Sequence, residues 1–290
     1  MPKSTLASRL ADFALCYNQA HMKIWRRDAG VSESNALLET DPGLAIKLFT
    51  MYAHERQGTN PSYSVYHRRA IESALERKGM TFERAVLAEA DFPELVWTEF
   101  EKQCPKDHFT KRPKSNPSHT IGPVKELLNI LATKSEPNWL LLLKKQGDQK
   151  HAFDLLNNLA GIGEKLAAFI VRDAYTINGL WASLPTGQEY TVQPLDVQVE
   201  RWSNRCWSGL FDGIPTTDTI SKMERVSQVC VEQETEPAAF NKGAWFVGSH
   251  FGRFLDMGSS NDVTLLALLD SLDIPKIVAA IGASPSRVGN

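Results

Sequence analysis

The sequence predicts an all-α protein, and three observations support this fold class. Most of the 290 residues lie in stretches where apolar side chains recur every three or four positions, which is the period of an amphipathic helix. Stretches that alternate strictly between apolar and polar residues, as half-buried strands do, are scarce. The composition, with 42% hydrophobic and 23% charged residues, is that of an ordinary globular protein. A helical fold with a sizeable core is therefore expected.

Helical periodicity first appears near the N-terminus and continues to a polar segment before the middle of the chain. Residues 104–120, CPKDHFTKRPKSNPSHT, contain three prolines and few apolar side chains, which is typical of a surface loop. We therefore expect an N-terminal helical region over residues 1–120 and a second region over 121–290. The helices expected around this loop are Leu6–Trp25, Pro42–His54, Ser64–Lys78, Thr81–Gln103 and Ile121–Lys134.

Beyond Glu136 the same periodicity predicts a further series of helices. An irregular stretch interrupts it, and within that stretch Glu189–Val192 would suit a short β segment. No internal repeat is present. The helices expected in this region are Trp139–Lys145, His151–Leu159, Glu164–Ile177, Asp196–Arg205, Thr217–Gln233, Pro237–Met257 and Asp262–Ile281.

Charge and apolar patterning restrict the classes of partner. Lysine and arginine total 32 and aspartate and glutamate 34, a net charge of −2, so a nucleic-acid partner must be held by local contacts rather than by an overall positive field. No apolar run approaches the ~20 residues that a membrane span requires. The N-terminal residues lack the apolar segment of a secretory signal. We therefore expect an intracellular protein without a membrane partner.

Metal and disulfide sites are not indicated. The four cysteines, Cys16, Cys104, Cys206 and Cys230, lie far apart and form no CxxC pair. The seven histidines show no ligand spacing such as HExxH. The sequence therefore predicts reduced thiols and no metal ion.

A glycine turn separates two apolar helical stretches in residues 155–171, LLNNLAGIGEKLAAFIV. Gly161 and Gly163 permit positive φ and a close approach of the backbone to an external group. Ile162 between them can point inward and brace the two helices. The N–H groups at the start of the second helix, together with the helix dipole, would suit a DNA phosphate. An ordinary helical hairpin with a glycine turn is the alternative interpretation.

This segment resembles the helix-hairpin-helix (HhH) motif of the HhH-GPD superfamily of base-excision DNA glycosylases, L-x-x-L-P-G-[IV]-G-x-K-x-A, with Ala160 in place of the usual proline. Residues 193–201, QPLDVQVER, resemble the proline-containing stretch and essential aspartate of the same family. Residues 240–248, FNKGAWFVG, are similar to its closing helix. The three landmarks occur in the family's order, and the resemblance implies a two-subdomain helical glycosylase fold with a cleft between the subdomains.

The resemblance assigns chemistry to two residues. Lys165 stands at the position whose amine attacks C1′ of the damaged nucleotide, forms a Schiff base and permits strand cleavage by β-elimination. Asp196 stands at the position of the carboxylate that stabilises positive charge on the sugar. Without the resemblance, Lys165 would be interpreted as a solvated helix residue and Asp196 as a helix N-cap.

The interval between Lys165 and Asp196 is 31 positions. It is longer than the interval in most of the superfamily and is similar to that in the archaeal 8-oxoguanine glycosylase branch. That branch stacks a tryptophan of the closing helix on the flipped base and has a polar residue one turn earlier. Trp245 and Asn241 have this spacing, although Asn241 replaces an acidic residue. The resemblance implies a glycosylase with AP (apurinic or apyrimidinic site) lyase activity on an oxidised purine, best matched by 8-oxoguanine.

Double-stranded DNA with a flipped damaged base is the partner that this resemblance implies. It would be bound through Gly161, Ile162 and Gly163 to a monomer. The expected location is intracellular, and it is the cytoplasm or nucleoid if the protein is prokaryotic. The four clustered C-terminal cysteines that bind an iron–sulfur cluster in many relatives are missing, so no cofactor is expected. Two alternatives stay open: a glycosylase for another modified base, for example in viral DNA, and a non-catalytic HhH module that grips DNA.

Overall fold

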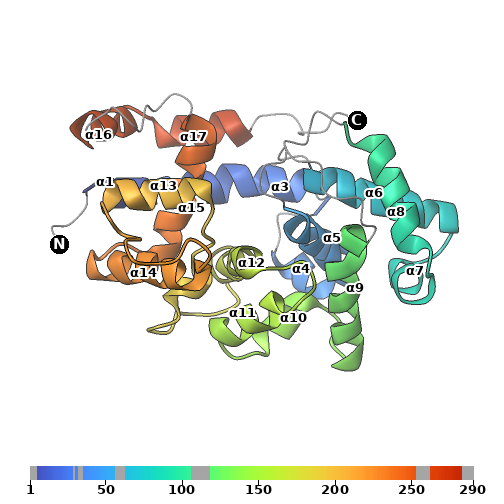
Figure 1. Cartoon of the computed structure of the whole chain (residues 1–290). Coiled ribbons are helices and arrows are strands. Elements are labelled where there is room, and N and C mark those ends of the chain that lie inside the picture. Colours follow the sequence, from blue (N-terminus) through green and yellow to red (C-terminus); the bar gives the residue numbers. More distant parts are fainter. Residues whose placement is uncertain are drawn as a thin grey trace. The chain divides into compact units, whose positions relative to one another are not determined.

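The computed structural model describes residues 5–28, 30–31, 35–55, 63–105, 118–252 and 262–282. Within these ranges every regular element is a helix and no strand occurs, which confirms the all-α class (Figure 1). No helix within these ranges has both the length and the apolar character to cross a bilayer.

The helices begin and end close to the expected positions in most of the chain. Up to the polar segment they are α1 (Thr5–Asp12), α2 (Ala14–Cys16), the π-helix η1 (Tyr17–His21), α3 (Met22–Asp28), α4 (Asn35–Thr40), α5 (Pro42–Ala53), α6 (Tyr63–Lys78), α7 (Phe82–Ala88) and α8 (Phe92–Gln103). Beyond it they are α9 (Ser118–Thr133), α10 (Trp139–Lys144), α11 (Gln149–Asn157), α12 (Glu164–Thr176), the 3₁₀-helix η3 (Glu189–Val192), α13 (Val197–Cys206), α14 (Thr219–Glu232), α15 (Pro237–Phe251), α16 (Asp262–Asp270) and α17 (Ile274–Gly282).

The described residues form two compact units. Unit 1 contains those within 1–25, 148–153 and 167–285, and unit 2 contains those within 26–147 and 154–166. The chain passes from one unit to the other inside α3, between α10 and α11 at residues 147–148, and again inside α11 and α12. The expected division at residue 120 follows a segment, 106–117, outside the described residues, and it stays a prediction.

Unit 2 has a core of aromatic side chains between α5, α6, α8, α9 and α10. Trp139 at the start of α10 is buried and donates its indole N–H to the carbonyl of Ala45 in α5 at 2.6 Å. The ring of His67 in α6 is stacked between His54, 4.3 Å away, and Phe100 of α8, 4.0 Å away. The hydrogen bond of Trp139 joins α5 to α10, which precedes the glycine hairpin, and the stacked rings join the end of α5 to α6 and α8.

Unit 1 is organised around α15, which packs on α1, α13 and α14 (Figure 1). The closest approach is between α15 and α1 at Gly243. A Cβ atom added at Gly243 would lie 1.7 Å from the carbonyl oxygen of Leu10, well inside van der Waals contact. Gly243 therefore permits the two helix backbones to touch, a role that only glycine can fill.

Gly243→Ala is expected to lower the free energy of unfolding by about 3 kcal/mol, because the obstructing atom is backbone and the helices must separate. Gly122→Ala in α9 is the matched control, since nothing lies within 4 Å of the added Cβ there. Alanine there should leave the free energy of unfolding within about 1 kcal/mol of the wild-type value, because its higher helix propensity is opposed by the steric effect of Pro123 on the preceding residue. Urea unfolding of both variants measures the difference, and equal stability of the two would contradict this packing.

Four of the expected elements differ from the structure. Glu189–Val192 forms a 3₁₀-helix, not a β segment, because Thr191 and Gln193 donate their N–H groups three residues back along the chain. The helix expected over Thr81–Gln103 is divided into α7 and α8, and Pro93 lies in the first turn of α8, where proline is favoured. The long N-terminal helix is divided by η1, and the last one is divided into α16 and α17.

Candidate functional site

The glycine hairpin has the predicted local conformation. Gly161 adopts φ 82° and is exposed, and Ile162 is 4% exposed. The N–H of Ile162 donates to the carbonyl of Leu159 at 2.9 Å, which closes the turn. The predicted inward position of Ile162 is therefore present. Contact of this turn with DNA stays a prediction.

Ala160 stands where the HhH-GPD pattern has proline, and its backbone N–H is hydrogen-bonded. Its N–H donates to the Oε2 atom of Glu126, a residue of α9 in the same unit. Proline has no N–H and could not make this hydrogen bond. The hydrogen bond to Glu126 thus holds the residue before the turn in place, whereas the HhH-GPD pattern has the rigid ring of proline at this position.

Gly163 has no packing reason to be glycine. It is exposed, and a Cβ added there would meet no atom within 4 Å. Its φ also lies outside the region that disfavours other residues. The absence of a side chain at this position leaves the backbone accessible to an external group immediately before α12.

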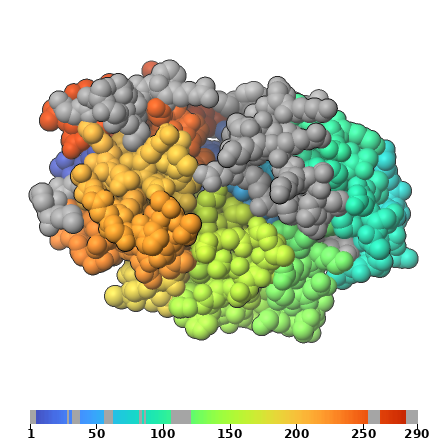
Figure 2. Space-filling view, in the orientation of Figure 1, coloured from blue at the N-terminus to red at the C-terminus, as the bar shows by residue number. Residues whose placement is uncertain are grey.

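Lys165 and Asp196 belong to different units. Lys165 is the second residue of α12, in the part of that helix assigned to unit 2, and it is half-buried. Asp196 belongs to unit 1 and is the N-cap of α13, whose surface is visible in Figure 2. The structure therefore places Lys165 in the first turn of the helix that follows the glycine hairpin, as predicted.

The capping interpretation of Asp196 is confirmed. Its Oδ1 atom accepts hydrogen bonds from the N–H groups of Gln198 and Val199, both at 2.9 Å. Among the described residues, no hydrogen bond reaches Oδ2. One oxygen of a half-buried carboxylate is therefore held by the helix, and the other is available for a further contact.

Trp245 lies on α15 at the edge of an aromatic cluster and is half-exposed rather than part of the core. The ring of His21 is 4.6 Å away, and Tyr17 meets it edge-on at 5.5 Å. His250, one turn later on α15, is 6.1 Å away and exposed. An aromatic side chain with one part accessible suits stacking on a planar ligand.

Asn241, one turn before Trp245, is fully buried and already hydrogen-bonded inside unit 1. Its Oδ1 atom accepts from Arg172 at 2.7 Å, and its amide donates to Oε1 of Gln193 at 2.9 Å and to the carbonyl of Pro194 at 3.1 Å. Two of these three partners are acceptors, so a carboxylate could not replace the amide. Through these hydrogen bonds Asn241 positions the segment leading to Asp196.

A buried polar network that the sequence analysis missed surrounds Asn241. Arg172 of α12 is 1% exposed, pairs with Asp173 at 2.9 Å and lies over the ring of Tyr17 at 4.5 Å. Arg172 also donates to the hydroxyl of Tyr17, which donates to Asp173 at 2.9 Å. Charged residues inside otherwise apolar helices are the signal that could have identified this network.

Lys242 is the second cation of the network and is 1% exposed. Burial lowers the pKa of its amine to about 7, an effect that Arg172 reinforces and Asp173 and Glu236 oppose. The folded protein therefore binds the proton of Lys242 less tightly than the unfolded chain, where lysine titrates near its ordinary value.

This difference predicts a pH-dependent stability. Between about pH 7 and about pH 10 the unfolded chain keeps a proton that folded Lys242 has released, so stability rises with pH across this window, by at most ~1.4 kcal/mol per pH unit. Lys242→Met should lose this rise. Urea unfolding of both proteins at several pH values measures this difference in pH dependence. Burial raises the pKa of Cys16 to about 11, which has the opposite effect on stability, but this effect is present in both proteins and cancels in the comparison. Parallel pH dependence in the two proteins would contradict the assignment.

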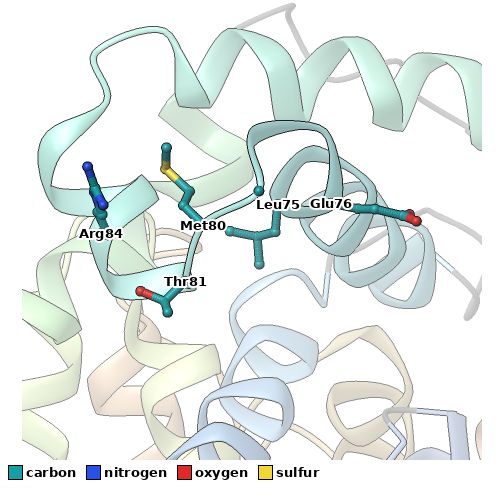
Figure 3. Close-up of a pocket in the computed structure, with 6 residues that line it drawn as sticks. Leu75, Glu76, Met80, Thr81 and Arg84 are labelled. Carbon is teal, nitrogen blue, oxygen red and sulfur yellow. The ribbon is translucent and has the colours of Figure 1, made fainter.

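An open hollow of about 520 Å³ lies in unit 2 between α6 and α7, away from the predicted site residues (Figure 3). Its lining contains no histidine or cysteine, and the side chain of Glu76 points away from Arg84. Within the described ranges, no group of three His, Cys, Asp or Glu side chains could hold a metal ion.

Comparisons with protein-family models, with curated proteins and with solved structures found no match to this chain.

Proposed function

We propose that this protein is a DNA glycosylase with AP lyase activity that removes an oxidised purine, with 8-oxoguanine as the preferred substrate. The observation that supports this most is the hairpin. Gly161 has positive φ, Gly163 is glycine without a packing reason, and Lys165 follows in the first turn of α12. A hairpin that served packing alone would require neither an open Gly163 nor a half-buried lysine at this point.

The proposed reaction uses the amine of Lys165 as nucleophile. Its lone pair forms a bond to C1′, and the glycosidic bond breaks with its electron pair going to the base, which then takes up a proton. The sugar ring opens to give a Schiff base with Lys165. Loss of the C2′ proton then expels the 3′ phosphate by β-elimination. Oδ2 of Asp196 stabilises the positive charge that develops on the sugar.

DNA binding in this proposal combines backbone contacts with base extrusion. The N–H groups at the start of α12, beside the backbone of Gly161 and Gly163, face a phosphate, which requires no overall positive charge on the protein. The damaged base leaves the duplex and stacks on the half-exposed Trp245. Asn241 orders the wall of the base pocket through Arg172 and the Gln193–Pro194 segment, a role consistent with its buried hydrogen bonds. We propose a monomer acting on duplex DNA in the cytoplasm or nucleoid.

Release of free base from a panel of duplexes tests the proposal. The duplexes contain 8-oxoguanine, uracil, an abasic site or only normal bases, and released bases and cleaved strands are quantified separately. We expect free 8-oxoguanine and strand cleavage from the first duplex. Cleavage at the abasic site alone would keep the lyase activity and indicate that the enzyme removes a modified base other than 8-oxoguanine. Tight binding without either product would favour a non-catalytic DNA-binding module and contradict the enzyme.

A further inference from the structure

Lys242 joins three elements of unit 1 through one buried amine. From the middle of α15 its Nζ atom donates to Oδ1 of Asn18 in η1 at 2.8 Å and to Oγ1 of Thr176, the last residue of α12. The hydroxyl of Thr176 donates its own proton to the carbonyl of Arg172 at 2.7 Å. Both partners of the amine are therefore acceptors, and Nζ must donate to each of them.

This arrangement is costly for packing alone. Neither hydrogen-bond partner is a carboxylate, and a buried amine without a direct counter-ion loses most of its hydration energy. An apolar side chain of similar length would fill the same space at lower cost. A lysine at this position is better explained by its two hydrogen bonds, which connect α15 to η1 and to the end of α12.

The element held by Lys242 provides the surroundings of Trp245. The π-helix η1 interrupts the helical run from Ala14 to Asp28, and such interruptions are frequent at functional sites. Tyr17 and His21 of η1 contact the ring of Trp245, and Asn18, the residue bonded to Lys242, lies between them in sequence. The Lys242–Asn18 hydrogen bond therefore fixes the two aromatic rings that border Trp245.

We propose that Lys242 is a positioning residue for base selection: it holds η1 against α12 and α15 so that Tyr17 and His21 leave one face of Trp245 open to an extruded base. This inference rests on the proposed function. It predicts that replacing Lys242 slows the reaction on a duplex whose damaged base must be held, and leaves the reaction on an abasic duplex unchanged.

The charge on the amine adds a pH dependence to this role. The ammonium form makes the stronger, charge-assisted hydrogen bonds to Asn18 and Thr176, so positioning is firmest when Lys242 is protonated. Because burial lowers the pKa of Lys242 to about 7, this form is lost as the pH rises through neutrality. The titratable groups around the amine are Tyr17 and His21 on η1, Arg172 and Asp173 on α12, and Glu236 at the start of α15.

The test compares two reactions of the full chain, excision of 8-oxoguanine from a duplex and borohydride trapping on the same duplex with an abasic site. Lys242→Met should slow excision by about 10- to 100-fold through misplacement of the base, and it should change trapping by less than about twofold. Lys222→Met is the matched control. Lys222 is also a buried lysine of unit 1, but it donates to Glu200 at 2.8 Å, and both reactions should be unaffected.

Asn18→Asp provides a second variant, which keeps Lys242 and serves if Lys242→Met fails to fold. A carboxylate at the position of the Asn18 amide would raise the pKa of Lys242. In the wild-type protein the ratio of excision to trapping should fall as the pH rises through about 7, and in Asn18→Asp this fall should move to higher pH. The ratio cancels ionisations that both reactions share.

The outcomes separate this inference from the proposed function. Equal losses of excision and trapping in Lys242→Met, or no loss of either, would overturn the positioning role while leaving the enzyme in place. A pH profile that is the same in Asn18→Asp and in the wild-type protein would also overturn it. Absence of both reactions from the wild-type protein would overturn the proposed function and this inference with it.

Discussion

Lys165→Ala is expected to abolish covalent trapping on both the 8-oxoguanine duplex and the abasic duplex. The proposed nucleophile is the only group removed, and alanine has the highest helix propensity, so α12 should stay intact. Duplex affinity should fall by less than about tenfold, since one contact among several is lost. Gel analysis after borohydride reduction measures trapping, and fluorescence anisotropy measures affinity.

Lys150→Ala is the matched control for this experiment. Lys150 is an exposed lysine of α11, the first helix of the hairpin, and its removal should leave the adduct at the wild-type level. A Lys165→Ala protein that binds the duplex and still forms the adduct would remove Lys165 from the mechanism. Loss of binding together with loss of trapping would assign Lys165 to DNA contact instead of chemistry.

Asp196→Asn is expected to slow base excision by about 10²- to 10³-fold, the usual cost of removing one group that stabilises charge in a transition state. The substitution separates catalysis from capping, because asparagine is as good an N-cap as aspartate. Its side-chain oxygen can still accept from the N–H groups of Gln198 and Val199. The free energy of unfolding should therefore change by less than about 0.5 kcal/mol.

Asp196→Ala supplies the contrast, since it removes both the charge and the cap. It should slow excision to a similar extent and also lower the free energy of unfolding by about 1 kcal/mol. Single-turnover excision kinetics and urea unfolding give the two quantities for each variant. Wild-type excision by Asp196→Asn would leave capping of α13 as the sole role of Asp196.

The sequence predicted most helices because their stability depends on local periodicity, and it was wrong where backbone details decide the outcome. The division near Pro93 was available in the sequence, since proline favours the first turn of a helix. The π-helix at Tyr17–His21 was not, because nothing in the local apolar pattern separates it from an α-helix. The same limit applies to Glu189–Val192, where side-chain propensity suits a strand and the backbone forms a 3₁₀ turn.

The hairpin conformation could be predicted because glycine spacing determines it locally. The hydrogen bond from Ala160 to Glu126 could not, since the two residues are 34 positions apart and the contact depends on the tertiary fold. The role of Asn241 also depends on tertiary contacts with Arg172 and Gln193. Lys242 was overlooked although its neighbours in α15 are largely apolar, and a lysine in an apolar helix is a signal for a buried amine.

The most direct test of the central claim is to locate the covalent bond itself. Wild-type protein is trapped with borohydride on an 8-oxoguanine duplex, the DNA and protein are digested, and the modified peptide is sequenced by mass spectrometry. We predict that the reduced sugar is attached to Nζ of Lys165. Attachment to Lys242 or to any other lysine, or the absence of an adduct, would contradict the proposal that the hairpin of α11 and α12 supplies the nucleophile.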